Sequence, residues 1–210
     1  ATHRCRRMRP PADNVSPPPA PPPTQPGFWA LVRSDAKVWA DLFGAAGRAR
    51  PRKIGPFRAL GMACAYPGLR ATLLYRMSHA AYRARIPGLP QFLSSLNVTL
   101  HGLDIIPGVR IGPHLYIPHP VGTVVTAHAI GARCTLVSGI TIGLRNGDFP
   151  TLGDDVYVGA GARILGGIRI GNGAKVGANA VVLTDVPDGF VAVGVPAKVI
   201  PPKTPEPPIE

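Results

Sequence analysis

Apolar residues return every six positions between residues 105 and 186, apart from two interruptions. The next residue is often glycine, as at Gly112, Gly131 and Gly177. A period of six fits neither an α-helix nor strands of alternating polarity. It predicts a mainly β protein built as a parallel β-helix, in which each hexapeptide makes one short strand and one turn. The predicted inward positions are Ile105, Ile111, Ile117, Val124, Ile130, Leu136, Ile142, Leu152, Val158, Ile164, Ile170, Val176 and Val182.

The fourth residue after most of these positions is small or aliphatic, and we expect it to point inward as well, as at Val121 and Cys134. Three hexapeptides, about 18 residues, close one triangular coil, and stacked coils bury each other's apolar side chains. The alternative is an all-β sandwich with glycine turns. Sandwich strands do not recur at a fixed interval of six, so the β-helix is favoured.

The repeat breaks twice. The step is seven residues between Ile117 and Val124, at PHPVGT, and ten between Ile142 and Leu152, at LRNGDFPT. Repeat proteins place such insertions as loops, often on the binding face. The two breaks therefore predict a functional site.

Helical spacing of apolar residues marks the chain before the repeat. It predicts helices over 28–46, 57–66, 68–85 and 89–101, with Ser34, Asp35 and Asp41 on a polar face of the first. We expect an α-helical subdomain over 28–102 that covers the open first coil of a β-helix over 103–200. After the last hexapeptide, VAVGVPAKVI is predicted to be one more extended segment.

The two ends differ in composition from the rest. Residues 1–27 are rich in arginine and proline, and 201–210 in proline and glutamate, so both are predicted to be tails, the first of them disordered. Lysine and arginine number 23 against 11 acidic residues, a net charge of +12, which implies an anionic partner. The folded basic regions lack interleaved aromatic residues, so we expect a phosphate-bearing small molecule rather than nucleic acid.

Cysteine usage and hydropathy bear on the compartment. No run of 18 apolar residues is present, so we expect no membrane span. Three cysteines, Cys5, Cys64 and Cys134, follow no motif spacing, which is typical of a reducing compartment. We therefore expect a cytoplasmic protein.

Several motifs carry a resemblance to a known family, chiefly HGLDIIPGVRIGPHLYIPHPVGTVV, GVPAKVI and, in the helical part, YPGLRATLLYRMSHAAYR. On these residues the chain resembles the left-handed β-helix acyltransferases, and among them the serine O-acetyltransferase family. The resemblance implies left-handed coiling, an exception to the usual right-handed crossover. It also implies that acetyl-CoA donates an acetyl group to a hydroxyl acceptor.

The same resemblance implies the catalytic pair. A hydroxyl is a poor nucleophile at neutral pH, so a base must accept its proton. The family uses a histidine that an aspartate one coil earlier orients, and the matching residues are His119 and Asp104. His119 could instead be a packed surface imidazole, or bind zinc with His114 and His128 as in carbonic anhydrases of this fold. The spacing matches the transferases better, and we expect no metal.

The acceptor site departs from the family. Serine acetyltransferases have an Arg-His pair where this chain has Asp148 and Phe149, and an aspartate where it has Pro118. An aspartate repels the carboxylate that an arginine would bind. Arg145 in the same loop is a candidate substitute cation. We therefore expect a hydroxyl acceptor without a carboxylate, such as a sugar, with L-serine (for cysteine biosynthesis) and a non-enzymatic hexapeptide scaffold as alternatives.

Acetyl-CoA is expected along the later coils. In the family, backbone groups of small residues hold its pantetheine arm, and cations meet its phosphates. The matching residues are Gly143, Ala160, Gly161, Ala178, Gly194, Ala197, Lys198 and Lys203. The resemblance also implies a homotrimer with sites between neighbouring subunits. A dimer of trimers paired through the helical part is the alternative, which the short helical part disfavours.

Overall fold

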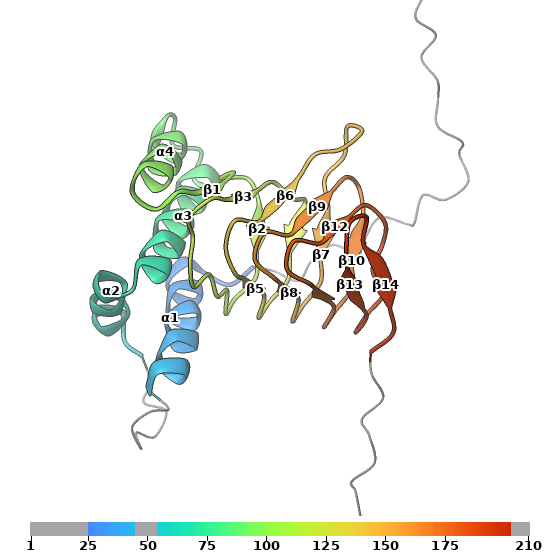
Figure 1. The fold of residues 1–210 in the computed structure, drawn as a ribbon. Coiled ribbons are helices and arrows are strands. Elements are labelled where there is room, and N and C mark those ends of the chain that lie inside the picture. Colours follow the sequence, from blue (N-terminus) through green and yellow to red (C-terminus); the bar gives the residue numbers. More distant parts are fainter. Residues whose placement is uncertain (1–24, 45–53, 203–210) are drawn as a thin grey trace, which may run out of the picture.

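In the part of the chain that the structure describes, four helices precede a triangular prism of stacked β coils (Figure 1). The structure is a computed structural model that describes residues 25–44 and 54–202. The predicted 1–27 tail therefore lies almost wholly outside the described residues, as does most of the 201–210 tail.

The helices follow the sequence pattern closely. They are α1 (Phe28–Gly44), α2 (Pro56–Ala65), α3 (Pro67–Arg83) and α4 (Leu89–His101). A proline stands in the first turn of α2, α3 and α4, where its missing N–H costs no hydrogen bond. Helix α4 ends at Gly102, whose φ of 64° is the left-handed conformation that favours glycine.

The three middle coils each contribute one strand to each of three sheets, whereas the first coil joins face C and the last coil joins face B only through isolated bridges, at Tyr116 and Val186. Face A contains β1-β3-β6-β9-β12, face B contains β10-β7-β4-β2, and face C contains β14-β13-β11-β8-β5. The strands are β1 (Leu103–Ile105), β2 (Arg110–Ile111), β3 (Thr123–Val125), β4 (Ala129–Ile130), β5 (Thr135–Leu136), β6 (Thr141–Gly143), β7 (Thr151–Leu152), β8 (Tyr157–Val158), β9 (Arg163–Leu165), β10 (Arg169–Ile170), β11 (Lys175–Val176), β12 (Val181–Val182), β13 (Val191–Val193) and β14 (Lys198–Ile200).

The last two strands depart from the prediction. The segment VAVGVPAKVI is not one extended strand but a hairpin, in which β14 pairs antiparallel with β13. Gly194, with a φ of 96°, begins its turn. The hairpin pairs the outer edge of β13, and β14 becomes the edge strand of face C.

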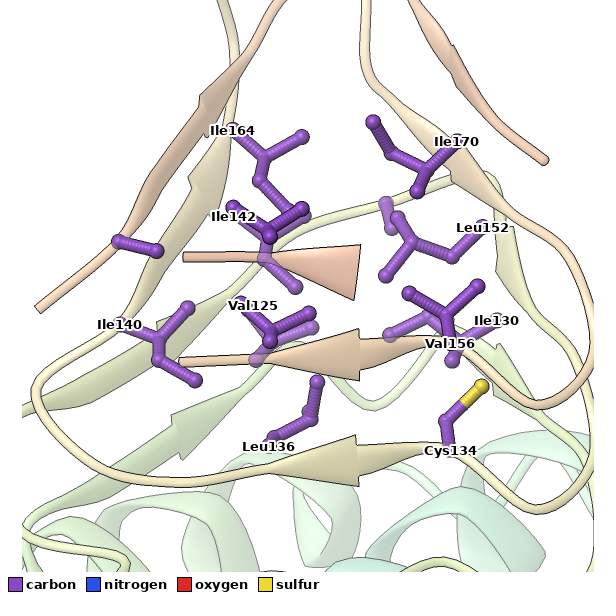
Figure 2. Packing of buried hydrophobic residues seen from close by; sticks show 14 of the residues in the cluster. Val125, Ile130, Cys134, Leu136, Ile140, Ile142, Leu152, Val156, Ile164 and Ile170 are labelled. Carbon is purple, nitrogen blue, oxygen red and sulfur yellow. The ribbon is translucent and has the colours of Figure 1, made fainter. Parts of the chain in front are cut away.

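Apart from Val121 and Val124, the predicted inward residues form one continuous core inside the prism (Figure 2). Leu136, Ile142 and Ile164 are fully buried, and the small second position is filled by residues such as Cys134 and Ala162. Burial raises the pKa of the Cys134 thiol to about 12, so this cysteine is an inert core residue.

The first break shifts the phase of the repeat, so the prediction of an inward side chain is wrong for two residues. Val124 is 40% exposed and Val121 is 70% exposed, whereas Val125 and Thr123 are fully buried. The turn after residue 117 takes up one residue more than expected, because Gly122 adopts a φ of 71° and donates its N–H to Gly102. The next large inward residue, Ile130, follows Val125 after five positions, which restores the period.

The turns between faces C and A stack into a column, here called the C–A corner. Its left-handed residues have φ values between 57° and 71°: they are Gly102, Gly122, Gly139, Gly161 and Asn179. Backbone hydrogen bonds join successive turns, from Gly139 N to Val121 O and from Gly161 N to Ser138 O. The corner is therefore a straight edge along the prism.

A buried ion pair joins the helices to the first coil. Asp35 was expected on a polar face, but it is 1% exposed and pairs with Arg76 of α3, at 2.9 Å from Nε to Oδ2. Arg76 also donates to the carbonyls of Ile111 and Gly112, and Asp35 accepts the N–H of Leu115. The pair was missed because its partners lie far apart in sequence.

Candidate functional site

His119 is exposed in the turn of the first break, at the C–A corner. Asp104 lies in the middle of β1, half-buried, with its side chain on the outer surface of face A because its neighbours Leu103 and Ile105 point into the core. Strand β1 pairs with β3, which begins four residues after His119, and Asp104 is in register with Val124. The two side chains thus lie on adjoining coils, although they do not form a hydrogen bond with each other.

Helix α3 supports the turn that carries His119. A Cβ at Gly68 would lie 2.0 Å from the carbonyl oxygen of Ile117 and 3.0 Å from that of Pro118. Only glycine therefore permits this close approach of the helix to the chain before His119. On the other side, Gly102 packs against Val121, where a Cβ would be 3.3 Å from its Cα.

Two polar residues that the sequence analysis missed belong to the helix ends that pack on this turn. Arg70 of α3 donates its Nε–H to Nε2 of His101, the last residue of α4, at 3.3 Å. Its Nη1 donates to the carbonyl of Cys64, near the end of α2, at 3.2 Å. Burial, and secondarily the charge of Arg70, lower the pKa of His101, which is consistent with a neutral ring that accepts this hydrogen bond. A short motif would not have revealed the pair, since its members are 31 residues apart.

The second break forms a loop between β6 and β7 at the junction of faces A and B. Asp148 accepts a hydrogen bond from Nε2 of His128 at 2.7 Å and one from the N–H of Phe149 at 2.8 Å. Both hydrogen bonds lower the pKa of the Asp148 carboxyl, and the one from His128 has the larger effect. The Phe149 ring stands edge-on to His128, with centroids 5.8 Å apart. His128 is thus part of this loop site.

Arg145 does not neutralise Asp148. Their backbones bridge each other across the loop, at 3.2 and 3.3 Å, but their side chains form no ion pair. The side chain of Arg145 instead runs beside Gly166. Within this loop, the group that faces the Asp148 carboxylate is His128.

The two breaks lie on opposite edges of face A. The first connects face C to face A before β3, and the second connects face A to face B after β6. His119 and Asp148 therefore border the same face but do not meet within one chain.

Most of the predicted acetyl-CoA residues gather at the C–A corner. Ala160 accepts the N–H of Asn179 at 2.8 Å, and the N–H of Ala197 bonds to Val181 at 2.8 Å. The remaining corner residues of this set are Gly161, Ala178 and Gly194. A Cβ at Gly161 would lie 2.0 Å from Oδ1 of Asn179, so the corner requires glycine there.

The other members of the set are placed differently. Gly143 is on β6 of face A, and Lys198 is exposed on β14. Lys203 lies outside the described residues. Arg163 of β9, which the sequence analysis did not single out, reaches the corner and donates Nη1 to the carbonyls of Gly139 and Gly161, at 2.6 and 2.9 Å.

Among the residues that the structure describes, no three His, Cys, Asp or Glu side chains come together as a metal site, so His114, His119 and His128 do not converge. Within residues 25–44 and 54–202, no helix combines the length and hydropathy that crossing a bilayer requires.

The chain is similar to known transferases in sequence and in structure. The family model "Bacterial transferase hexapeptide (six repeats)" matches residues 149–184. Serine acetyltransferase of Helicobacter pylori is 44% identical over 140 residues, which cover 64% of this chain and 82% of that protein. The chain belongs to the serine acetyltransferase family. The Synechococcus elongatus serine acetyltransferase is 42% identical over 140 residues, 64% of this chain but only 57% of its own length.

Solved structures of this family confirm the predicted fold class. Neisseria gonorrhoeae serine acetyltransferase in complex with serine superposes with a TM-score of 0.68 and 32% identity, covering 81% of this chain and 68% of that one. A serine acetyltransferase in complex with CoA gives a TM-score of 0.69 and 28% identity, with the same shares covered. Family membership thus confirms the predicted resemblance to the left-handed β-helix acyltransferases.

Proposed function

We propose that this protein transfers the acetyl group of acetyl-CoA to the hydroxyl of L-serine. The observation that carries the proposal is the exposed His119 in the turn next to the strand of Asp104, in a chain whose relatives are serine acetyltransferases. The solved relatives with serine and with CoA support the two substrates. The expected sugar acceptor has no such support among the relatives, so L-serine replaces it as the first candidate.

The proposed reaction uses His119 as a general base. Its free ring nitrogen accepts the hydroxyl proton while the hydroxyl oxygen attacks the thioester carbonyl carbon. The tetrahedral intermediate then expels the thiolate of CoA, which takes the proton back from the imidazolium. Asp104 acts as a positioning residue that orients the ring, and this requires the two side chains to come within hydrogen-bond distance when substrate binds.

The proposed place for acetyl-CoA is the C–A corner. The corner leads from the His119 turn past Ala160, Gly161 and Ala178 to the hairpin, where Lys198 is exposed to meet a phosphate. Small residues along it leave backbone groups open to a thin pantetheine arm. Arg163 fixes the carbonyls of Gly139 and Gly161, so it supports this edge.

A second candidate acceptor is a hydroxyl compound without a carboxylate, such as a sugar. Asp148 and its exposed position favour it, because an anionic side chain in the acceptor loop repels a carboxylate. If this candidate is correct, Asp148→Arg combined with Phe149→His should raise turnover of L-serine, which wild type would use poorly.

An acceptor panel tests the proposal. Acetyl-CoA is mixed with L-serine, L-serinamide or a set of monosaccharides, and free CoA thiol is measured. We expect the highest kcat/KM with L-serine. A sugar that exceeds L-serine would select the second candidate, and absence of thiol release with every acceptor would favour a scaffold and reject the enzyme.

A further inference from the structure

We propose that Arg70 binds the carboxylate of the acceptor, as a specificity-determining residue supplied by the helical part of the chain. The inference rests on the proposed function, since it names the group of L-serine that this side chain contacts. It also addresses the problem that Asp148 raises: the acceptor loop of this chain offers an anion to a substrate that itself carries a carboxylate.

The guanidinium of Arg70 is held in place without being neutralised. Two of its nitrogens are fixed by the carboxyl ends of two helices: Nε by His101 of α4 and Nη1 by the carbonyl of Cys64 in α2. Its Nη2 has no hydrogen-bond partner and its charge no acidic partner among residues 25–44 and 54–202. Arginine has five N–H donors, so three remain for a ligand.

The position of Arg70 is fixed relative to His119 by contacts on both sides. Two residues before Arg70, Gly68 packs on the carbonyls of Ile117 and Pro118, which lead into His119. One residue after His101, Gly102 packs on Val121, which follows His119 by two. The turn of His119 is thus clasped by the same two segments that hold the guanidinium.

This placement suits a carboxylate better than another anion of the substrates. A guanidinium presents parallel N–H groups that match the two oxygens of a carboxylate, and a side chain already fixed loses little entropy on binding. Arg70 is exposed, so a small acceptor can reach it. The phosphates of acetyl-CoA are proposed to lie toward Lys198 at the opposite end of the C–A corner, so they do not compete for it.

The test compares acceptors that differ only in the carboxylate. Steady-state kinetics are measured with L-serine and with L-serinamide for wild type, Arg70→Gln and Arg70→Lys. We expect Arg70→Gln to raise KM for L-serine about ten- to hundredfold, the range for loss of a charge-assisted hydrogen bond, with KM for acetyl-CoA unchanged. L-serinamide should be affected less than threefold, and Arg70→Lys should give an intermediate KM because it keeps the charge without the planar fork.

Arg83→Gln is the matched control. Arg83 is an exposed arginine at the far end of the same helix, so its loss removes the same charge without touching the His119 turn. Its kinetics should equal those of wild type. Thermal unfolding of all variants reports whether the loss of the hydrogen bonds to His101 and Cys64 disturbs the fold.

A binding measurement separates this inference from the proposed function. Ligand titration by thermal shift gives the midpoint for L-serine and for L-serinamide in the absence of acetyl-CoA. If wild type prefers L-serine and Arg70→Gln loses that preference, the inference stands even if no acetyl transfer occurs. If wild type has no preference, or Arg70→Gln and Arg70→Lys keep it, Arg70 does not bind the carboxylate.

Discussion

His119 differs from the residues around it because it belongs to the break and not to the repeat. Within a hexapeptide every side chain either fills the prism or lies on a flat face, and both positions are repeated in every coil. The break at 118–122 releases one side chain from this pattern. An imidazole placed there can move toward a substrate without disturbing the core.

The catalytic assignment predicts a specific kinetic pattern. His119→Ala should lower kcat about 10²- to 10⁴-fold, because the base acts in the transition state, and should leave the affinity for acetyl-CoA nearly unchanged. Asp104→Asn should lower kcat less. His114→Asn is the control, since its φ of 62° suits asparagine and it is not part of the proposed site. Wild-type kcat in His119→Ala would mean that another group is the base.

The Asp148 contact predicts a pH response. The pKa of the Asp148 carboxyl is lowered from an ordinary value of 3.8, mainly by the hydrogen bond from His128. The contact therefore stabilises the loop fully at pH values above 3.8, and this stabilisation is lost as the pH falls through the lowered pKa. In His128→Ala the carboxyl should titrate at higher pH than in wild type, as followed by NMR of the Asp148 side chain. Identical midpoints would show that the hydrogen bond does not persist in solution.

At the residue scale, the family motif predicts His119 and Asp104 as a catalytic pair, and this stays a prediction, whereas residues that only tertiary contact brings together were missed. His119 and Asp104 are fifteen positions apart, a spacing tied to one coil, so the repeat itself places them on neighbouring coils. Arg70 and Asp35 have no such spacing rule. Their partners come from other helices, and no local pattern distinguishes them from solvated surface charges.

At the scale of single elements, the β3 strand tests the phase of the repeat. Val125→Ala should reduce the free energy of unfolding by about 2 kcal/mol, because two methyl groups leave a close-packed interior. The neighbouring Val124→Ala should change it by less than about 0.5 kcal/mol, since that side chain is on the surface. Chemical denaturation of the two variants measures both values. A larger loss of unfolding free energy in Val124→Ala than in Val125→Ala would show that Val124, and not Val125, is the core residue.

Helices and regular hexapeptides were predicted well, while irregular turns were not. The range predicted for the fourth helix is identical to that of α4, because Pro90 and Gly102 mark its ends in the sequence. The first break and the β13–β14 hairpin were misjudged. In both, the geometry depends on left-handed glycines, Gly122 and Gly194, whose conformation is set by the coil next to them.

At the scale of the whole molecule, the separation of the two breaks predicts assembly. His119 and Asp148 occupy opposite edges of face A, so a site that draws on both would need a neighbouring subunit. We expect a trimer, with a mass of three times 22.0 kDa by light scattering at micromolar concentration. A monomer under these conditions would contradict this, and twice the trimer mass would indicate pairing of trimers through the helices.

The straight C–A corner has a geometric consequence for the evolution of the proposed co-substrate site. Successive coils are about 4.8 Å apart, so the number of coils between His119 and the hairpin fixes how long a molecule must be to touch both. Loss or gain of one complete coil would change that length by a single step and leave every remaining hexapeptide in phase. If the donor lies along this corner as proposed, the length of donor that fits changes only in steps of one coil, whereas the choice of acceptor can change through single substitutions in the loops and in α3.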